Sequence, residues 1–131
     1  MITLSPEHWA ARMRGTLELL NEGGTDPFIR VYDGVRAATT AEAPSGVLLA
    51  SVPLARPAGI LTGAVLTLRL AEVSGLVVTT GEASWARVIN GAGVVVFDCD
   101  IGSGPGPWEI TINKTRLLLG GYCQIISAVL R

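Results

Sequence analysis

The chain has 131 residues, a length that suits one domain with one hydrophobic core. Hydrophobic residues make up 49% of the sequence and charged residues only 16%, so few charges are available to cover the surface of a monomer. We therefore expect part of the surface to be buried against other subunits. The formal charge of -1 leaves no basic excess to neutralise a phosphate backbone, and we expect no nucleic-acid partner.

The sequence also argues against a membrane segment. The long uncharged run Leu117–Leu130 contains Gly120, Gly121 and Gln124 and is shorter than the ~20 apolar residues of a spanning helix, so it predicts a core strand. The first residues, Met1–Glu7, lack a basic region followed by an apolar stretch. We expect the protein to be made and kept in a cytoplasm.

The first twenty residues have the pattern of an amphipathic helix, which we predict over residues 5–21. Ser5 is placed to cap it, Pro6 suits its first turn and Glu7 complements the positive end of its dipole. Gly23 and Gly24 favour a left-handed stop after it. One face carries the apolar stripe that must dock on another surface, formed by Trp9, Met13, Leu17 and Leu20.

After Pro27 the hydrophobic pattern changes to a period of two, which is typical of half-buried strands. We predict an all-β domain over residues 28–131, mainly an antiparallel β-sandwich or jelly-roll-like barrel, so that residues 1–131 form a single domain. Between the first two strands, Ala37–Ser45 predicts a loop or an extended arm, and Arg56–Gly59 predicts a break. The expected strands lie at 28–32, 46–54 with Pro53 at an edge or end, 65–70, 72–80, 82–89, 94–101, 108–112 and 121–130.

The clearest local signal is a hairpin at Asn90-Gly91, between two β-rich runs, because both residues accept positive φ at low cost. The following segment, residues 102–107, contains only Gly, Pro and Ser and predicts a surface loop. No helix pattern follows it, so it is interpreted as a connector and not as a phosphate-binding loop.

Residues with catalytic or metal-binding chemistry are few and scattered. His8 is the single histidine and lies in the first helical turn, without a nucleophile in a suitable context. Alternation places Cys99 and Cys123 in the core as small apolar residues. Asp98 and Asp100 point to the same side of one strand, where we expect a solvated outer face. We predict no catalytic residues, no cofactor and no metal site, and therefore no enzyme.

Three further residues are candidates for an interface. Trp85 and Arg87 share one strand face and Trp108 opens another strand, and both residue types are enriched at binding hot spots. A tryptophan that plugs the end of the sandwich is the alternative interpretation. Together with the helix stripe, the predicted interface candidates are Trp9, Met13, Leu17, Leu20, Trp85, Arg87 and Trp108.

Three segments carry a family resemblance. Residues 28–38, 46–50 and 83–95 read FIRVYDGVRAA, GVLLA and ASWARVINGAGVV. They resemble small structural proteins of tailed bacteriophages and prophages, in which an N-terminal helix precedes strands of the form R-[IV]-Y-[DS]-G-x-R-P-A and T-W-x-R-[IV]. Ala37 stands at the position of the proline in that pattern. The resemblance carries no catalytic residues and implies a virion component, either a capsid decoration protein or a small tail protein.

The leading hypothesis is a non-enzymatic virion protein that decorates and stiffens the capsid. Its expected partners are copies of itself, as a trimer or dimer, and the major capsid protein or another virion protein. The alternative is a receptor-binding or carbohydrate-binding module at the tail, which requires Trp85, Arg87 and Trp108 to cluster on an exposed face. A third reading, a small hydrolase that uses Asp98 and Asp100, has the least support.

Overall fold

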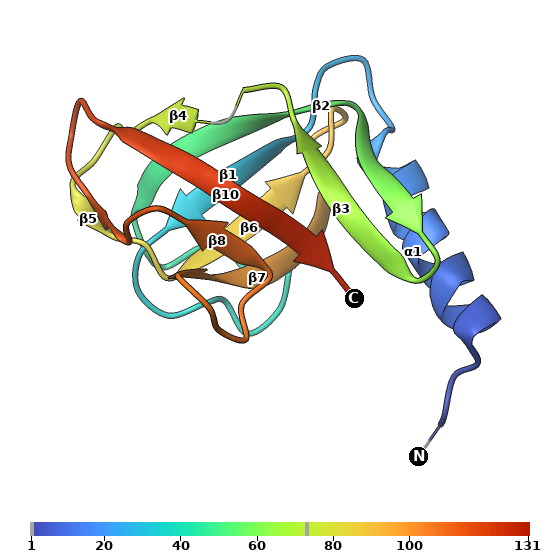
Figure 1. The fold of residues 1–131 in the computed structure, drawn as a ribbon. Helices are drawn as coiled ribbons and strands as arrows, with labels where there is room; N and C mark the ends of the chain where they lie inside the picture. Colours follow the sequence, from blue (N-terminus) through green and yellow to red (C-terminus); the bar gives the residue numbers. More distant parts are fainter. Residues whose placement is uncertain (1, 73) are drawn as a thin grey trace.

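Seven strands close into a barrel-like sheet in the computed structural model, which describes residues 2–72 and 74–131 (Figure 1). The predicted β-rich chain with one N-terminal helix is confirmed. A clear jelly-roll sandwich of two facing sheets is not formed, because β10 pairs with β3 and closes the sheet into a ring. The strands around the barrel are β3 (Val65–Leu70), β2 (Leu48–Thr62), β1 (Phe28–Tyr32), β6 (Trp85–Ile89), β7 (Val95–Ser103), β8 (Ile110–Ile112) and β10 (Tyr122–Leu130).

Three shorter strands complete the sheet structure. β4 (Ser74–Leu76) follows β3 along the chain and pairs with the first part of β10. β5 (Gly81–Glu82) and β9 (Arg116–Leu117) pair with each other as a separate two-stranded sheet. The barrel interior is filled by aliphatic side chains from every barrel strand, so that it is a packed core and not a channel.

One neighbouring pair in the barrel is parallel, namely β7 with β8. Strand directions cannot alternate all the way round a closed ring of seven, so at least one parallel pair is required. Parallel neighbours normally need a connection of a dozen or more residues, but here only 101–103 and 110–112 overlap, and residues 104–109 are enough. The indole of Trp108 lies against Gly102 and Gly106, where an added Cβ would come within 2.2 Å of the ring. The Gly-Pro segment is therefore packed around Trp108 instead of being a plain connector.

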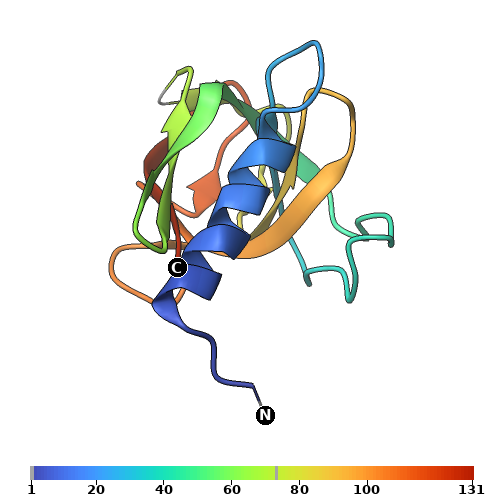
Figure 2. The ribbon, with the colours of Figure 1, turned by 90° about the vertical axis from the view of Figure 1, so that its right-hand side faces the viewer.

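The helix α1 (Pro6–Leu20) lies across one end of the barrel (Figure 2). Its predicted start is confirmed, because the Ser5 hydroxyl accepts a hydrogen bond from the His8 amide at 3.1 Å. Its last carbonyls are satisfied by distant side chains: Asn90 donates to Leu19 O at 2.9 Å, and Arg56 donates to Asn21 O and Gly23 O. The helix is thus tied to the barrel at its C-terminal end.

The strand β2 corrects the predicted break at Arg56–Gly59. It continues to Thr62 through a shift in its register with β3 between Leu54 and Gly59. Pro53 is tolerated inside it because of where its backbone faces. Leu54 N donates to Pro27 O on the β1 side at 2.8 Å, whereas Pro53 O accepts from Ala71 N at 3.0 Å. The nitrogen and the carbonyl of a strand residue face the same side, so the Pro53 nitrogen, which has no hydrogen to donate, faces Ala71 just after the end of β3.

The predicted hairpin is confirmed, but Asn90 acts in it through its side chain. Asn90 N donates to Val94 O at 2.9 Å, and the positive φ falls on Gly93 instead of on Asn90 or Gly91. The Asn90 side chain is 1% exposed, and its Oδ1 accepts from Ala92 N and Val94 N at 3.0 Å each. The Asn90 side-chain amide also donates to Leu19 O, so this one side chain joins the hairpin turn to the helix.

Candidate functional site

Residues 33–47, which we call the covering loop, contact the outer face of β6 and β7. Asp33 pins both of its ends: the Asp33 carboxylate accepts from Val47 N at 2.6 Å, and Asp33 O accepts from the Trp85 indole N–H at 3.1 Å. The Ser84 hydroxyl donates to Gly34 O. All five residues of β6 are buried, although every second one points out of the barrel, and the covering loop contacts two of the outward residues, Trp85 and Arg87.

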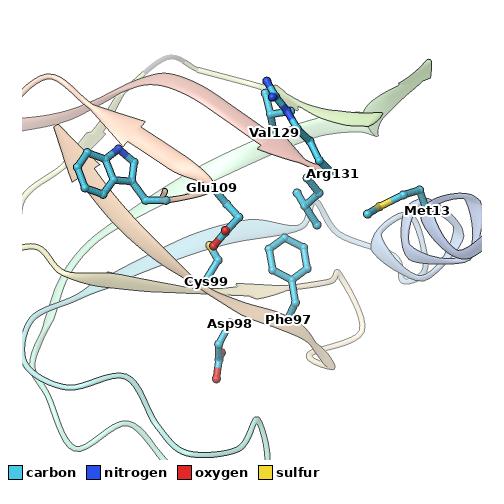
Figure 3. Close-up of a pocket in the computed structure, with 9 residues that line it drawn as sticks. Met13, Phe97, Asp98, Cys99, Glu109, Val129 and Arg131 are labelled. Atoms are coloured by element: carbon cyan, nitrogen blue, oxygen red, sulfur yellow. The ribbon is translucent and has the colours of Figure 1, made fainter. Parts of the chain in front are cut away.

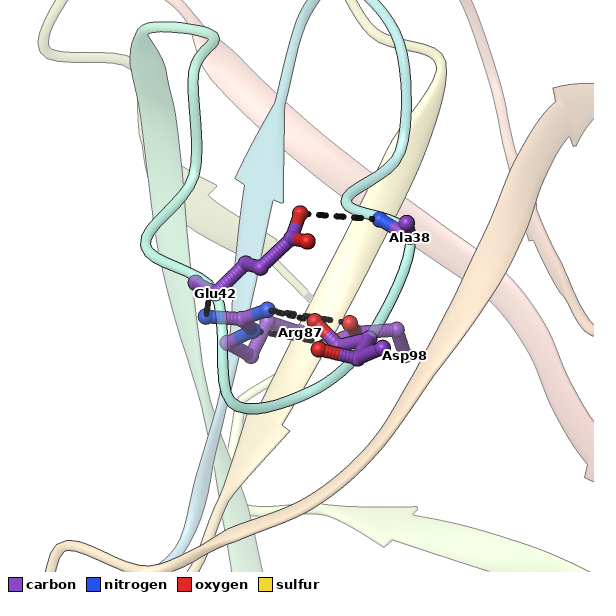
Figure 4. A network of polar contacts seen from close by, with 5 residues as sticks. Ala38, Glu42, Arg87 and Asp98 are labelled. Atoms are coloured by element: carbon purple, nitrogen blue, oxygen red, sulfur yellow. Dashed lines mark hydrogen bonds and ion pairs between the residues drawn. The ribbon is translucent and has the colours of Figure 1, made fainter.

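An ion pair beneath the covering loop holds its middle part (Figure 4). Arg87 binds the Asp98 carboxylate with two hydrogen bonds, at 2.8 Å from Nε and 3.0 Å from Nη2. It also donates to Glu42 O at 2.8 Å and to Thr39 O at 3.4 Å. The side chains of the pair are only 6% and 8% exposed, and the hydrogen bonds that Arg87 donates to Asp98 raise the pKa of Arg87 above its ordinary value.

These contacts correct two expectations. The expected solvated face is not formed at Asp98, because its carboxylate is buried against Arg87. Only Asp100 is solvent-exposed, in a pair with Arg36 at 3.2 Å. Arg87, a predicted interface candidate, donates its hydrogen bonds to Asp98 and to loop carbonyls within its own chain. Arg87 and Asp98 therefore hold the covering loop in place.

The three residues proposed for an exposed binding platform are not brought together. Trp85 is 1% exposed and stacks on Tyr32 with ring centroids 4.8 Å apart. Trp108 is half-buried over the loop that connects β7 to β8, where its indole donates to Gly104 O at 3.2 Å. The receptor-binding or carbohydrate-binding alternative thus lacks the exposed cluster on which it depends.

The helix stripe divides in the same way. Met13 and Leu20 are buried and Leu17 packs against the core, so these three candidates attach α1 to its own barrel. Trp9 is different: it is 40% exposed, with the Arg12 guanidinium 5.5 Å from its ring centroid. Of the predicted interface candidates, Trp9 leaves the most of a large side chain open to solvent.

The two cysteines and the single histidine lie on separate elements of the fold. Cys99 and Cys123 are free and buried, on strands separated by β8. Burial raises the pKa of Cys123 to about 11 and raises the pKa of Cys99 as well, which keeps both thiols protonated and unreactive near neutral pH. His8 lies on the exposed side of the first helical turn. Within residues 2–72 and 74–131, no group of three or more His, Cys, Asp or Glu residues has metal-binding geometry.

A different feature, which sequence reasoning missed, is a group of exposed apolar side chains at the corner formed by β4 and the turn from β9 into β10. Leu76 pairs across the strands with Tyr122, and Val77 exchanges backbone hydrogen bonds with Gly120 and Gly121, which places Val78 beside them. We call this group the apolar corner. Each of its members is more than half exposed: Leu76, Val78, Leu118, Leu119 and Tyr122.

The apolar corner has the size of the largest apolar patch on a typical monomer. Its five side chains offer on the order of 500 Å² of apolar surface, and a patch of that kind is often functional. The run Leu117-Leu118-Leu119 is its sequence signal. The sequence pattern predicts a core strand that includes these three leucines. In the structure Leu117 alone is buried, and Leu118 and Leu119 belong to a turn.

No protein-family model, curated protein or solved structure matches this chain. Among the described residues, the single helix is too short and too polar to traverse a lipid bilayer.

Proposed function

We propose that the protein is a non-enzymatic structural component of a tailed-phage particle, a capsid decoration protein that binds copies of itself or the major capsid protein. The observation that carries the proposal is the apolar corner, because the largest apolar patch on a monomer is often a functional surface. Its position on strand ends and a turn of a closed barrel presents it as a fixed surface.

Two further observations support this function. The resemblance of residues 28–38, 46–50 and 83–95 is to virion proteins, and these residues build β1, β2, β6 and the hairpin that follows. The buried Arg87–Asp98 pair holds the covering loop, so these two charges serve the chain's own fold. Multivalent attachment to a repeating lattice then multiplies the weak binding of each copy.

The test uses intact particles. Particles purified on a density gradient are expected to contain the protein in stoichiometric proportion to the major capsid protein, as measured by quantitative mass spectrometry. The Leu119→Asp variant is expected to fall at least tenfold in copy number, because a charge at the apolar corner opposes its burial.

The matched control is Val35→Asp, which introduces the same charge at a side chain that is 81% exposed on the covering loop, away from the apolar corner. This variant is expected to be incorporated normally. Recovery of the unaltered protein from the soluble lysate alone, with none on the particles, refutes the proposal.

A further inference from the structure

The barrel wall is incomplete between β7 and β10. β8 covers only residues 101–103 of β7 and 125–128 of β10, so no described strand stands between the first part of β7 and the end of β10. A cavity of about 290 Å³ occupies this interval (Figure 3). Phe97 and Cys99 line it from β7, Val129 lines it from β10, and Met13 of α1 lies at its far end.

The edge of β7 in this interval presents free backbone groups. Ile101 N donates to Ser84 O on the β6 side, and successive residues of a strand direct their backbone groups to opposite sides. Asp100 and Asp98 therefore direct theirs toward the cavity. Glu109 takes up the first of these positions, since its carboxylate accepts from Asp100 N at 3.1 Å and its carbonyl accepts from Val129 N at 3.0 Å. Beyond Glu109, the edge is a template for one more strand.

The chain itself carries a segment of the right form, residues 2–5. Ser5, the last residue of this segment, has an extended backbone with φ -68° and ψ 159°, and the segment leaves α1 in a direction away from its own barrel (Figures 1 and 2). Ile2 is 82% exposed. In a strand, Ile2 and Leu4 share one face and Thr3 points to the other, which matches a cavity that is apolar on its inner side.

Charge and area favour the same occupant. Residues 2–6 carry no ionisable side chain, and the Asp98 carboxylate beside the cavity is already bound to Arg87. The first charge after the segment is Glu7, and the rim of the cavity carries Arg131. Reciprocal exchange of two such segments between two copies buries on the order of 1,000 Å², where specific interfaces begin.

We propose that residues 2–5 of a second copy of this chain add as a β-strand to the edge of β7, in the gap between β7 and β10. The inserted strand donates to and accepts from the Asp98 backbone, and its Ile2 and Leu4 side chains fill the cavity beside Phe97 and Val129. This inference rests on the gap in the barrel wall and does not depend on the apolar corner or on a phage particle.

Disulfide trapping tests the proposal. The full chain carries Cys99→Ala and Cys123→Ala to remove the native thiols, together with Val129→Cys and either Ile2→Cys or Leu4→Cys. Diamide accepts the two electrons and two protons that the paired thiols release. We expect covalent dimers on a non-reducing gel for at least one of the two combinations, at least tenfold more than when the new cysteine on β10 is Ile126→Cys, whose site is 59% exposed and lies outside the cavity.

Variants that carry only Ile2→Cys or only Leu4→Cys measure disulfide linkage between two N-terminal segments. If these variants form as much covalent dimer as the variants that also carry Val129→Cys, the proposal is contradicted. A cross-link confined to monomers means that the segment enters its own barrel and also contradicts it. Sedimentation equilibrium gives a second readout: Ile2→Asp with Leu4→Asp is expected to weaken dimerisation at least tenfold, whereas Thr3→Asp is not. Absence of both cross-links and dimers in the unaltered chain overturns the inference.

Discussion

The outer surface of the barrel is buried at β6 and exposed at β4. Outside β6, the covering loop buries Trp85 and the Arg87–Asp98 pair, and each polar group of the pair finds a partner. Outside β4, Leu76 and its neighbours remain bare. The covered face uses charge and backbone contacts to fasten the chain to itself, and the corner leaves apolar side chains exposed. Under the proposed function, stability and association therefore depend on separate residues.

The largest expected effect comes from breaking the fastening at Arg87. Arg87→Ala leaves the Asp98 carboxylate buried without a partner, which typically costs about 3–5 kcal/mol. Urea denaturation measures the loss. The control is Arg36→Ala, which removes the exposed partner of Asp100 and is expected to cost less than about 1 kcal/mol. Equal losses in the two variants mean that the buried pair does not hold the covering loop.

Asn90→Ala is expected to be the next most costly change. It removes the acceptor of two hairpin amides and the donor to Leu19 O, and a buried unsatisfied group costs about 1–3 kcal/mol. The free energy of unfolding should fall by about 2 kcal/mol. Asn113→Ala, which removes an exposed contact to Lys114 N, serves as the comparison and should change stability little. Hydrogen exchange at the C-terminal end of α1 should accelerate in the first variant alone.

The buried thiols predict a dependence of stability on pH. The pKa of Cys123 is raised to about 11 by burial, above the roughly 8.5 of an unfolded chain, so the unfolded state releases its proton first as the pH rises. The contribution is fully present below about pH 8.5 and is lost between there and about pH 11, on the order of 3 kcal/mol. Denaturation series at several pH values, with Cys123→Ala as the control, should show a shallower decline in the variant. An unchanged slope contradicts the assignment.

The smallest effect on stability is expected at the apolar corner. Leu119→Asp should change the free energy of unfolding by no more than about 0.5 kcal/mol, because the side chain is 68% exposed. The same change should weaken the association of the protein with copies of itself or with the major capsid protein, as measured by sedimentation velocity. Val35→Asp should leave this association unchanged. A large loss of stability in Leu119→Asp would show that the corner belongs to the fold and would erase its contrast with the face outside β6.

Sequence reasoning succeeded where a structure depends on residues close together in the chain. The helix start at Ser5, the hairpin after Ile89 and the alternation of Leu66 and Leu68 with exposed neighbours all follow from local patterns. It failed at β2, because the strand continues through Arg56–Gly59 by a shift in its register with β3, which depends on a partner strand and leaves no local pattern. It also placed Leu118 and Leu119 in a core strand, because an apolar run does not reveal which of its residues turn outward.

The candidate sites could be predicted only in part for the same reason. Cys99 and Cys123 were predicted in the core from alternation, and both are buried. The residue types of Trp85 and Arg87 suggested binding, and Arg87 does bind, but its partners Glu42 and Asp98 belong to its own chain. An arginine in a sequence carries no sign of whether a loop far along the chain will reach it.

The amino-acid sequence by itself determined a β-rich chain with a capped amphipathic helix, an Asn-Gly hairpin and too few charges for an ordinary surface. Those properties depend on composition and on spacings of two to four residues. The tertiary structure decided the closure of β3 on β10, the parallel pairing of β7 with β8, the cover over Trp85 and the gap beside Phe97. Each of these depends on pairing between segments distant in the chain, where many arrangements satisfy the same local pattern and only packing of the whole barrel selects one.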